Sequence, residues 1–147
     1  MSHKIERSVI VKAPIKKVWE AISDYKNFGQ WFQARIDQPF EEGKCSSGAM
    51  TIPGYEHLPF EIKVIQVVKE ELLSFEWAPF INEKTDLSNE PWQLVEFKLE
   101  SVSEGTRISI TESGFEKISE KYREDARRGN EKGWEFQIKN LERYVTR

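Results

Sequence analysis

One acidic residue, Glu112, has the clearest potential for chemistry. Ile108, Ile110 and Glu112 alternate along an expected strand and share one face, which is the core face if the isoleucines are buried. A buried carboxylate is costly unless it is hydrogen-bonded, so we expect either a raised pKa or a partner. Glu112 could anchor a ligand or act as a general acid or base. The sequence favours a plainer role, an acid hydrogen-bonded to the final helix or to water.

Large aromatic residues are the second set of candidates. Phe75 and Trp77 fall on one face of an expected strand, and Trp134 falls on the apolar face of an expected C-terminal helix. Large rings suit flat apolar ligands, and an indole N–H can orient such ligands. We therefore expect these three residues and Trp31 to line a cavity. For each of them, filling a solid core is the alternative.

The segment between Gly48 and Phe60 is rich in glycine and proline and could cover such a cavity. It contains Tyr55 and His57, and Phe60 begins the strand that follows. The complete set of predicted ligand-binding residues is Trp31, Tyr55, His57, Phe60, Phe75, Trp77, Glu112 and Trp134.

The remaining reactive residues do not form a known constellation. His3 and His57 are far apart and Cys45 is the single cysteine, which gives no metal-ligand spacing. The sequence contains neither a G-x-S-x-G nucleophile motif nor a glycine-rich phosphate-binding motif. We expect no metal and no cofactor. Glu112 would be catalytic only if the protein is an enzyme, and no second catalytic group stands at a predictable spacing.

Length and composition indicate a single domain over residues 1–147. Its 22 basic and 25 acidic residues give a net charge of −3, which argues against a nucleic-acid-coating protein. One cysteine excludes an internal disulfide framework. No apolar run approaches the roughly 20 residues of a membrane span, and the first residues lack a signal-peptide core. We expect a cytoplasmic protein that is not inserted in a membrane.

The order of elements follows from periodicity. Alternation over 5–11 predicts a strand, Pro14 opens a short helix with an apolar face, and 24–32 predicts a second short helix or turn. Glycine and proline then separate several strands, and a polar loop is expected at 82–90. The clearest of these strands cover 60–69, 72–78, 92–101 and 106–112.

The chain ends in a long helix. Trp134, Ile138, Leu141 and Val145 form one apolar stripe over 130–146, and the helix could begin as early as 115–119. An antiparallel sheet with one apolar face needs a cover, which only this helix is long enough to supply. The small residues at 126, 129 and 133 could leave space beneath it, or could mark a kink or a boundary between two helices.

Two segments resemble the START-like, or SRPBCC, superfamily. They are the opening IERSVIVKAPIKKVWEAISDYKNFGQWF and the ending EGTRISITESGF with NEKGWEFQIKNLERYV. More narrowly, the chain is similar to the branch related to the activator of the ninety-kilodalton heat-shock chaperone ATPase. The cues are VWEAI, Trp31, Gly105-Thr106, the Glu112-x-Gly114-Phe115 motif, and Gly133-Trp134 opening a helix that ends in Leu141-x-x-Tyr144.

The resemblance implies an α+β helix-grip fold, in which a curved antiparallel sheet wraps around the C-terminal helix after two short helices. It also implies a cavity for a lipid, sterol, polyketide or other apolar molecule. Binding a small apolar, for instance flavonoid-like, molecule is therefore the favoured function. The alternatives are a protein-interaction module that stimulates a chaperone ATPase, and a cyclase, dehydratase or hydrolase that uses Glu112 in the same cavity, helped by His57 or Tyr55.

Overall fold

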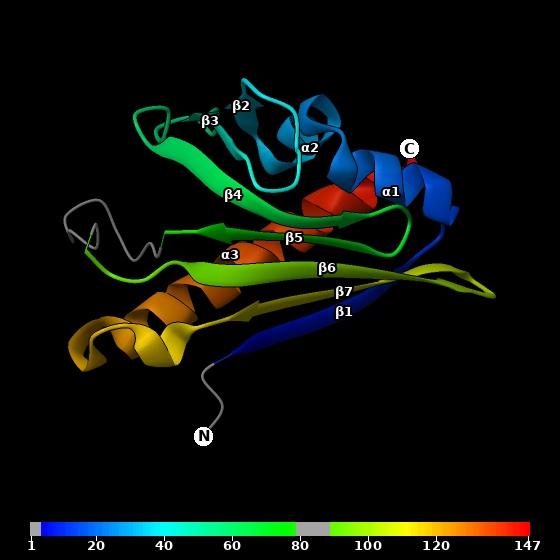
Figure 1. The fold of residues 1–147 in the computed structure, drawn as a ribbon. Helices are drawn as coiled ribbons and strands as arrows, with labels where there is room; N and C mark the ends of the chain where they lie inside the picture. The colour runs from blue at the N-terminus through cyan, green and yellow to red at the C-terminus, as the bar shows by residue number, and fades with distance from the viewer. Residues whose placement is uncertain (1–3, 79–88) are drawn as a thin grey trace.

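Seven strands pair in one antiparallel sheet, whose order across the sheet is β1-β7-β6-β5-β4-β3-β2 (Figure 1). The computed structural model describes residues 4–78 and 89–147. The strands are β1 (Ile5–Val11), β2 (Ala34–Ile36), β3 (Cys45–Met50), β4 (Pro59–Val68), β5 (Leu72–Trp77), β6 (Gln93–Val102) and β7 (Gly105–Ser113). The helices are α1 (Ile15–Ser23), α2 (Tyr25–Phe32), the 3-10 turn η1 (Phe115–Lys117) and α3 (Glu120–Thr146).

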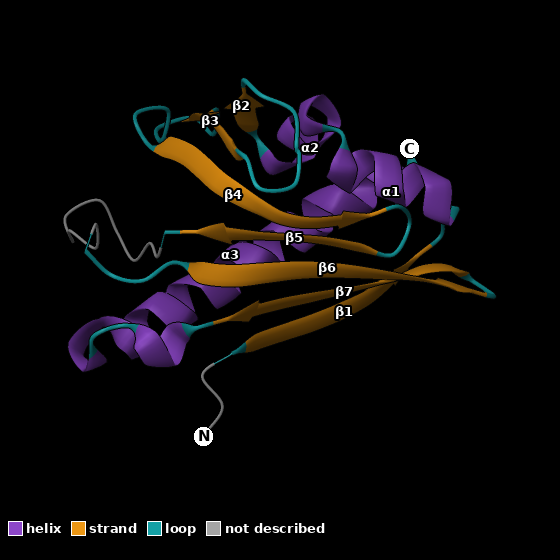
Figure 2. Ribbon diagram, viewed as in Figure 1, coloured by secondary structure: helices purple, strands orange, loops and turns teal. Residues whose placement is uncertain are grey.

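Strand alternation separates the two faces of the sheet. In β7, Thr106, Ile108, Ile110 and Glu112 are all buried, while the residues between them are partly exposed. This face meets the helices, and α3 runs across it behind the strands (Figure 2). The predicted α+β helix-grip architecture is thereby confirmed. Of the expected polar loop at 82–90, the first seven residues lie outside the described residues.

The two short helices cross from β1 to β2 at one end of the sheet. Pro14 precedes the first turn of α1, and the carboxylate of Asp24 caps α2 by accepting hydrogen bonds from the backbone N–H groups of Lys26 and Asn27. The helix α2 ends at Phe32, and the capping residue Gln33 that follows adopts a left-handed conformation. This turn brings the chain directly into β2.

The helix α3 is continuous over 27 residues, so its glycines mark neither a break nor a boundary. It begins at Glu120, after η1, and not at the earliest predicted position. Its buried stripe contains Trp134, Leu141 and Val145 as predicted. Gln137 is buried as well, whereas Ile138 is only half-buried.

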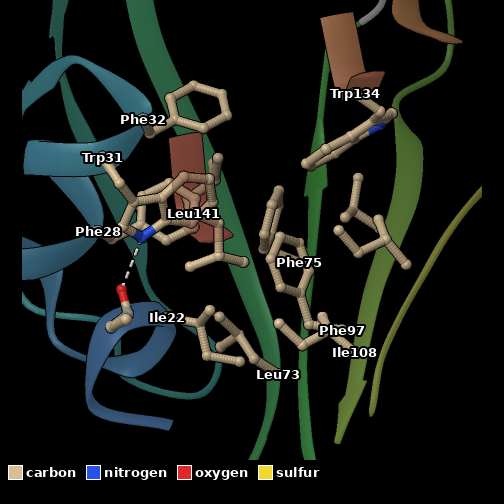
Figure 3. Close-up of a cluster of buried hydrophobic side chains, with 14 of the residues drawn as sticks. Ile22, Phe28, Trp31, Phe32, Leu73, Phe75, Phe97, Ile108, Trp134 and Leu141 are labelled. Atoms are coloured by element: carbon tan, nitrogen blue, oxygen red, sulfur yellow. Dashed lines mark hydrogen bonds between the residues drawn. The ribbon is translucent and has the colours of Figure 1, made fainter. Parts of the chain in front are cut away.

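The hydrophobic core lies where α1, α2 and the second half of α3 meet the sheet (Figure 3). Phe28 is fully buried and packs at ring-centroid distances of 4.7 Å from Trp31 and 6.4 Å from Phe75. The Trp31 indole N–H donates a 2.8 Å hydrogen bond to the carbonyl oxygen of Ala21, drawn as a dashed line in Figure 3. The hydrophobic side chains of this cluster are buried against one another. None of the described helices is long and apolar enough to cross a membrane.

Candidate functional site

A pocket of about 490 Å³ lies between the sheet and the middle of α3, where residues between 129 and 137 contribute to its lining. One wall is α3, and the others are the C-terminal end of α2, β3, the loop between β3 and β4, the start of β4 and the end of β5. Gly129 and Gly133 are part of the α3 wall. A Cβ built on Gly133 would meet no described heavy atom within 4 Å beyond its own stretch of helix. The space beneath the helix therefore follows in part from residues that have no side chain.

Aromatic rings form most of the inner wall. The rings of Trp77 and Trp134 stack at a centroid distance of 5.5 Å and an interplanar angle of 24°. Phe32 lies 6.0 Å from Trp77 and 5.7 Å from Phe60, measured between ring centroids. Such packed rings give a rigid apolar surface. Figure 3 shows Trp134 above Phe75 at the edge of the core.

The mouth of the pocket carries two exposed aromatic side chains. Tyr55, in the loop between β3 and β4, is 47% exposed, and Phe136 of α3 is 51% exposed. Gly54, which has a φ of +91°, lies in a turn closed by a 2.9 Å hydrogen bond from the backbone N–H of Tyr55 to the carbonyl oxygen of Ile52. Exposed rings at the rim of an apolar pocket are typical of a binding site.

Glu112 lies directly behind the stacked pair of tryptophans. It is fully buried, and its Oε2 accepts hydrogen bonds from the indole N–H of Trp77 at 2.7 Å and the amide of Asn130 at 2.8 Å. Its Oε1 accepts a hydrogen bond from the indole N–H of Trp134 at 2.9 Å. Burial raises the pKa of Glu112 above its ordinary value of 4.5, and the three donated hydrogen bonds oppose that rise.

This arrangement bears on what Glu112 can do chemically. Both of its oxygens are engaged, and it is not among the described residues that line the pocket, although Trp77, Asn130 and Trp134 are. A general acid or base must come within hydrogen-bonding distance of the reacting atom. The geometry therefore suits support of the wall better than proton transfer to a bound molecule.

The structure brings half of the predicted ligand-binding residues together. Tyr55, Phe60, Trp77 and Trp134 line the pocket. Trp31 and Phe75 are not among its lining residues and lie in the closed core, as the core-filling alternative expected.

The predicted helper His57 is also absent from the lining, and its side chain is exposed at the surface. It therefore does not stand beside Glu112.

Sequence reasoning missed other lining residues, chiefly Phe32, Met50, Asn130 and Phe136. Only Phe136 carried a usable signal, because it is an apolar residue off the buried stripe of α3. Within the described residues, no group of three or more His, Cys, Asp or Glu side chains is placed to hold a metal ion.

Comparison with solved structures identifies the same fold in several bacterial proteins. Protein MLL2253 from Mesorhizobium loti matches with a TM-score of 0.77 at 19% identity, over 97% of this chain and 96% of that one. Protein CV1439 from Chromobacterium violaceum matches with a TM-score of 0.72 at 18% identity, over 100% and 99% of the two chains.

A third match is DynU16, from the dynemicin biosynthetic locus, with a TM-score of 0.76 at 23% identity. The match covers 99% of this chain but 48% of that one. At these identities the likeness concerns the fold alone.

A search of curated proteins finds no match. The family model described as "Activator of Hsp90 ATPase homolog 1-like protein" matches residues 12–146, which is nearly the whole chain. The chain belongs to this family.

Proposed function

We propose that this protein binds a small, uncharged, largely apolar molecule in the pocket between α3 and the sheet. Molecules with a lipid-, sterol-, polyketide- or flavonoid-like skeleton fit this description. The observation that carries the proposal is the open pocket whose inner wall contains Trp77, Trp134, Phe32 and Phe60. Its volume of about 490 Å³ falls within the range of roughly 300–1,000 Å³ that is typical of small-molecule sites.

The charge of the lining supports an uncharged ligand. Glu61 is the one charged side chain among the described lining residues, and it is exposed at the surface. An anionic headgroup would have no lysine or arginine beside it in this lining, and desolvating an unpaired charge is costly. Neutral ring compounds are therefore favoured over fatty acids.

A matched pair of fluorescent probes tests the proposal. N-phenylnaphthylamine is neutral, and anilinonaphthalene sulfonate has a similar skeleton with an added negative charge. We expect saturable binding of the neutral probe and at least about tenfold weaker binding of the sulfonate. Tryptophan fluorescence should report both titrations, because Trp77 and Trp134 belong to the wall. Absence of saturable binding by neutral ring compounds would refute the proposal.

Two leucine variants on α3 separate the pocket from general surface stickiness. Gly133→Leu places a side chain into the space under the helix, whereas Lys132→Leu adds the same side chain at an exposed neighbouring position outside the lining. We expect the first variant to lose probe binding and the second to retain it. Equal loss in both would show that the probe binds elsewhere.

Family membership supports a second candidate, stimulation of a chaperone ATPase through protein contacts. A pull-down with the cognate chaperone and a measurement of its ATPase turnover test this candidate. Increased turnover that survives Gly133→Leu would indicate an interaction independent of the pocket. The enzyme alternative has less support, because the oxygens of Glu112 are occupied behind the wall.

A further inference from the structure

We propose that Glu112 is the positioning residue of the pocket, whose carboxylate fixes the rings of Trp77 and Trp134 and so makes the pocket selective for flat over flexible apolar molecules. The selectivity in this inference rests on the proposed function. The positioning of the rings does not, because it is a property of the protein without ligand.

The first support is the identity of the hydrogen-bond partners of Glu112. The described hydrogen bonds to its carboxylate come from Trp77, Asn130 and Trp134, and all three residues line the pocket. They stand on two elements, β5 and α3, while Glu112 itself stands on β7. One buried carboxylate thus joins three elements at a single point behind the wall.

The second support is the geometry of the ring pair. An indole has one N–H donor, so a hydrogen bond to that group together with packing on the ring faces fixes how the ring is turned. The distances of 2.7 Å and 2.9 Å from the Trp77 and Trp134 nitrogens to separate carboxylate oxygens hold the two rings in register. Their stacked arrangement, with 24° between planes, presents a flat wall.

The third support is that α3 has other attachments and does not need Glu112 as an anchor. Arg7 of β1 forms an ion pair with Glu135 at 2.8 Å, and the Gln137 amide donates to the carbonyl oxygen of Phe32 at 2.9 Å. The Tyr144 hydroxyl also hydrogen-bonds Asn27 at 3.0 Å. Replacement of Glu112 should therefore change the wall more than the docking of the helix.

The substitution Glu112→Gln tests the positioning role, because it keeps the size and shape of the side chain but replaces one accepting oxygen with an NH₂ donor. A carboxylate only accepts hydrogen bonds, whereas a glutamine amide has one accepting oxygen and one NH₂ donor. Since Oε2 accepts two hydrogen bonds and Oε1 accepts one, we expect the amide oxygen at the Oε2 position and the NH₂ facing the Trp134 N–H. Two donors would then face each other, and the Trp134 ring should turn.

Two readouts distinguish positioning from a merely structural role. The first is the circular dichroism couplet of the two stacked indoles, which should shrink in Glu112→Gln. The second is the ratio of affinities for N-phenylnaphthylamine, which is flat, and a long-chain alcohol, which is flexible and displaces the probe. We expect this ratio to fall by about tenfold in the variant. In a Trp134→Phe background, where no N–H faces the amide, Glu112→Gln should change the ratio far less.

The matched control is Thr106→Val on the same strand. Thr106 is fully buried and its hydroxyl donates a 2.8 Å hydrogen bond to the carbonyl oxygen of Ala13, at the other end of β7 from the pocket. Loss of this hydrogen bond in Thr106→Val should lower the free energy of unfolding without changing the circular dichroism couplet or the affinity ratio. If Glu112→Gln behaves in the same way, the positioning role is wrong.

A measurement on the unmodified protein covers the case in which Glu112→Gln fails to fold. In a proton–nitrogen correlation spectrum, the indole N–H groups of Trp77 and Trp134 should exchange slowly with solvent, as that of Trp31 should. Fast exchange of either would overturn the inference, and slow exchange of both supports it. If the unmodified protein binds neither apolar probe, the proposed function fails, while the couplet and the exchange rates still decide whether Glu112 positions the rings.

Discussion

Gly133 offers a direct test of whether space exists under α3, because glycine in the middle of a helix is costly. Replacing it with alanine should remove a penalty of about 1 kcal/mol in helix propensity. The new Cβ would meet no described heavy atom within 4 Å beyond its own stretch of helix, so no steric cost offsets that gain. We therefore expect Gly133→Ala to raise the free energy of unfolding by about 1 kcal/mol.

The assay is urea unfolding, supported by thermal melting. For a chain of this length, about 1 kcal/mol corresponds to a rise of roughly 2–4 °C in the melting temperature. Gly29→Ala in α2 is the matched control, because the Cβ there would lie 2.4 Å from the carbonyl oxygen of Ala34. The same substitution should therefore stabilise the protein at Gly133 and destabilise it at Gly29.

The result also bears on function. If Gly133 is retained to keep the pocket open, filling its position with a large side chain should abolish binding without loss of stability, which is the trade-off expected of a binding site. A lower free energy of unfolding for Gly133→Ala would mean that the helix packs against other atoms at this position in solution. The pocket and the proposed function would then both be in doubt.

Three further predictions concern the predicted site residues. Trp31→Phe leaves the carbonyl of Ala21 without its donor and should lower the free energy of unfolding by about 1–2 kcal/mol, while the affinity for N-phenylnaphthylamine stays unchanged. Tyr55→Ala should weaken that affinity several-fold and His57→Ala should not, since only Tyr55 lines the pocket; equal titrations would contradict this. Burial raises the pKa of Glu112 in the folded protein above 4.5, its ordinary value, so the folded state binds the Glu112 proton more tightly than the unfolded chain does. The stabilisation from this tighter proton binding is fully present below pH 4.5 and is lost as the pH rises through the folded-state pKa. Urea unfolding should therefore show wild-type stability falling relative to Glu112→Gln as the pH is raised, and a constant or growing difference would refute this reasoning.

Periodicity predicted the order of the elements and the buried face of several of them, while the helix-grip architecture was predicted from the family resemblance. In β7 the two-residue period placed Ile108, Ile110 and Glu112 on the buried face, and the stripe of α3 correctly included Trp134 and Leu141. These patterns are reliable because each element buries one face whatever its neighbours are. Of the two interpretations of the small residues of α3, space beneath the helix agrees with the position of Gly129 and Gly133 in the pocket lining, and a kink or boundary does not agree with the continuous helix.

Periodicity does not specify how the elements pack against one another, and so it could not predict which side chains face the pocket. Trp31 and Phe32 are adjacent aromatic residues, and only the packing of α2 on α1 and the sheet decides that Trp31 points into the core while Phe32 reaches the pocket. Tyr55 and His57 lie in a loop, where no period fixes which side chain faces inward. The burial of Glu112 was predictable, but its donors come from β5 and α3, whose register against β7 the sequence does not specify.

The helix α3 has two different environments along its length. Leu141 and Val145, near the C-terminal end of the helix, are buried in the core, while residues between 129 and 137, which include both glycines, contribute to the lining of the pocket. Side chains such as Phe136 and Tyr55 can therefore change without disturbing the packing that holds the protein together, because their exposed rings contribute little to the core.

Glu112 is the exception to this separation. It is fully buried in the folded core, yet each described hydrogen bond to its carboxylate comes from a residue of the pocket wall. A substitution there should affect both stability and ligand choice, whereas one at the rim should affect only the second. The opposite result would be that variants of Glu112 and variants of the rim residues change stability and ligand choice to the same extent. The pocket and the core would then be a single unit, and selectivity could not vary independently of stability.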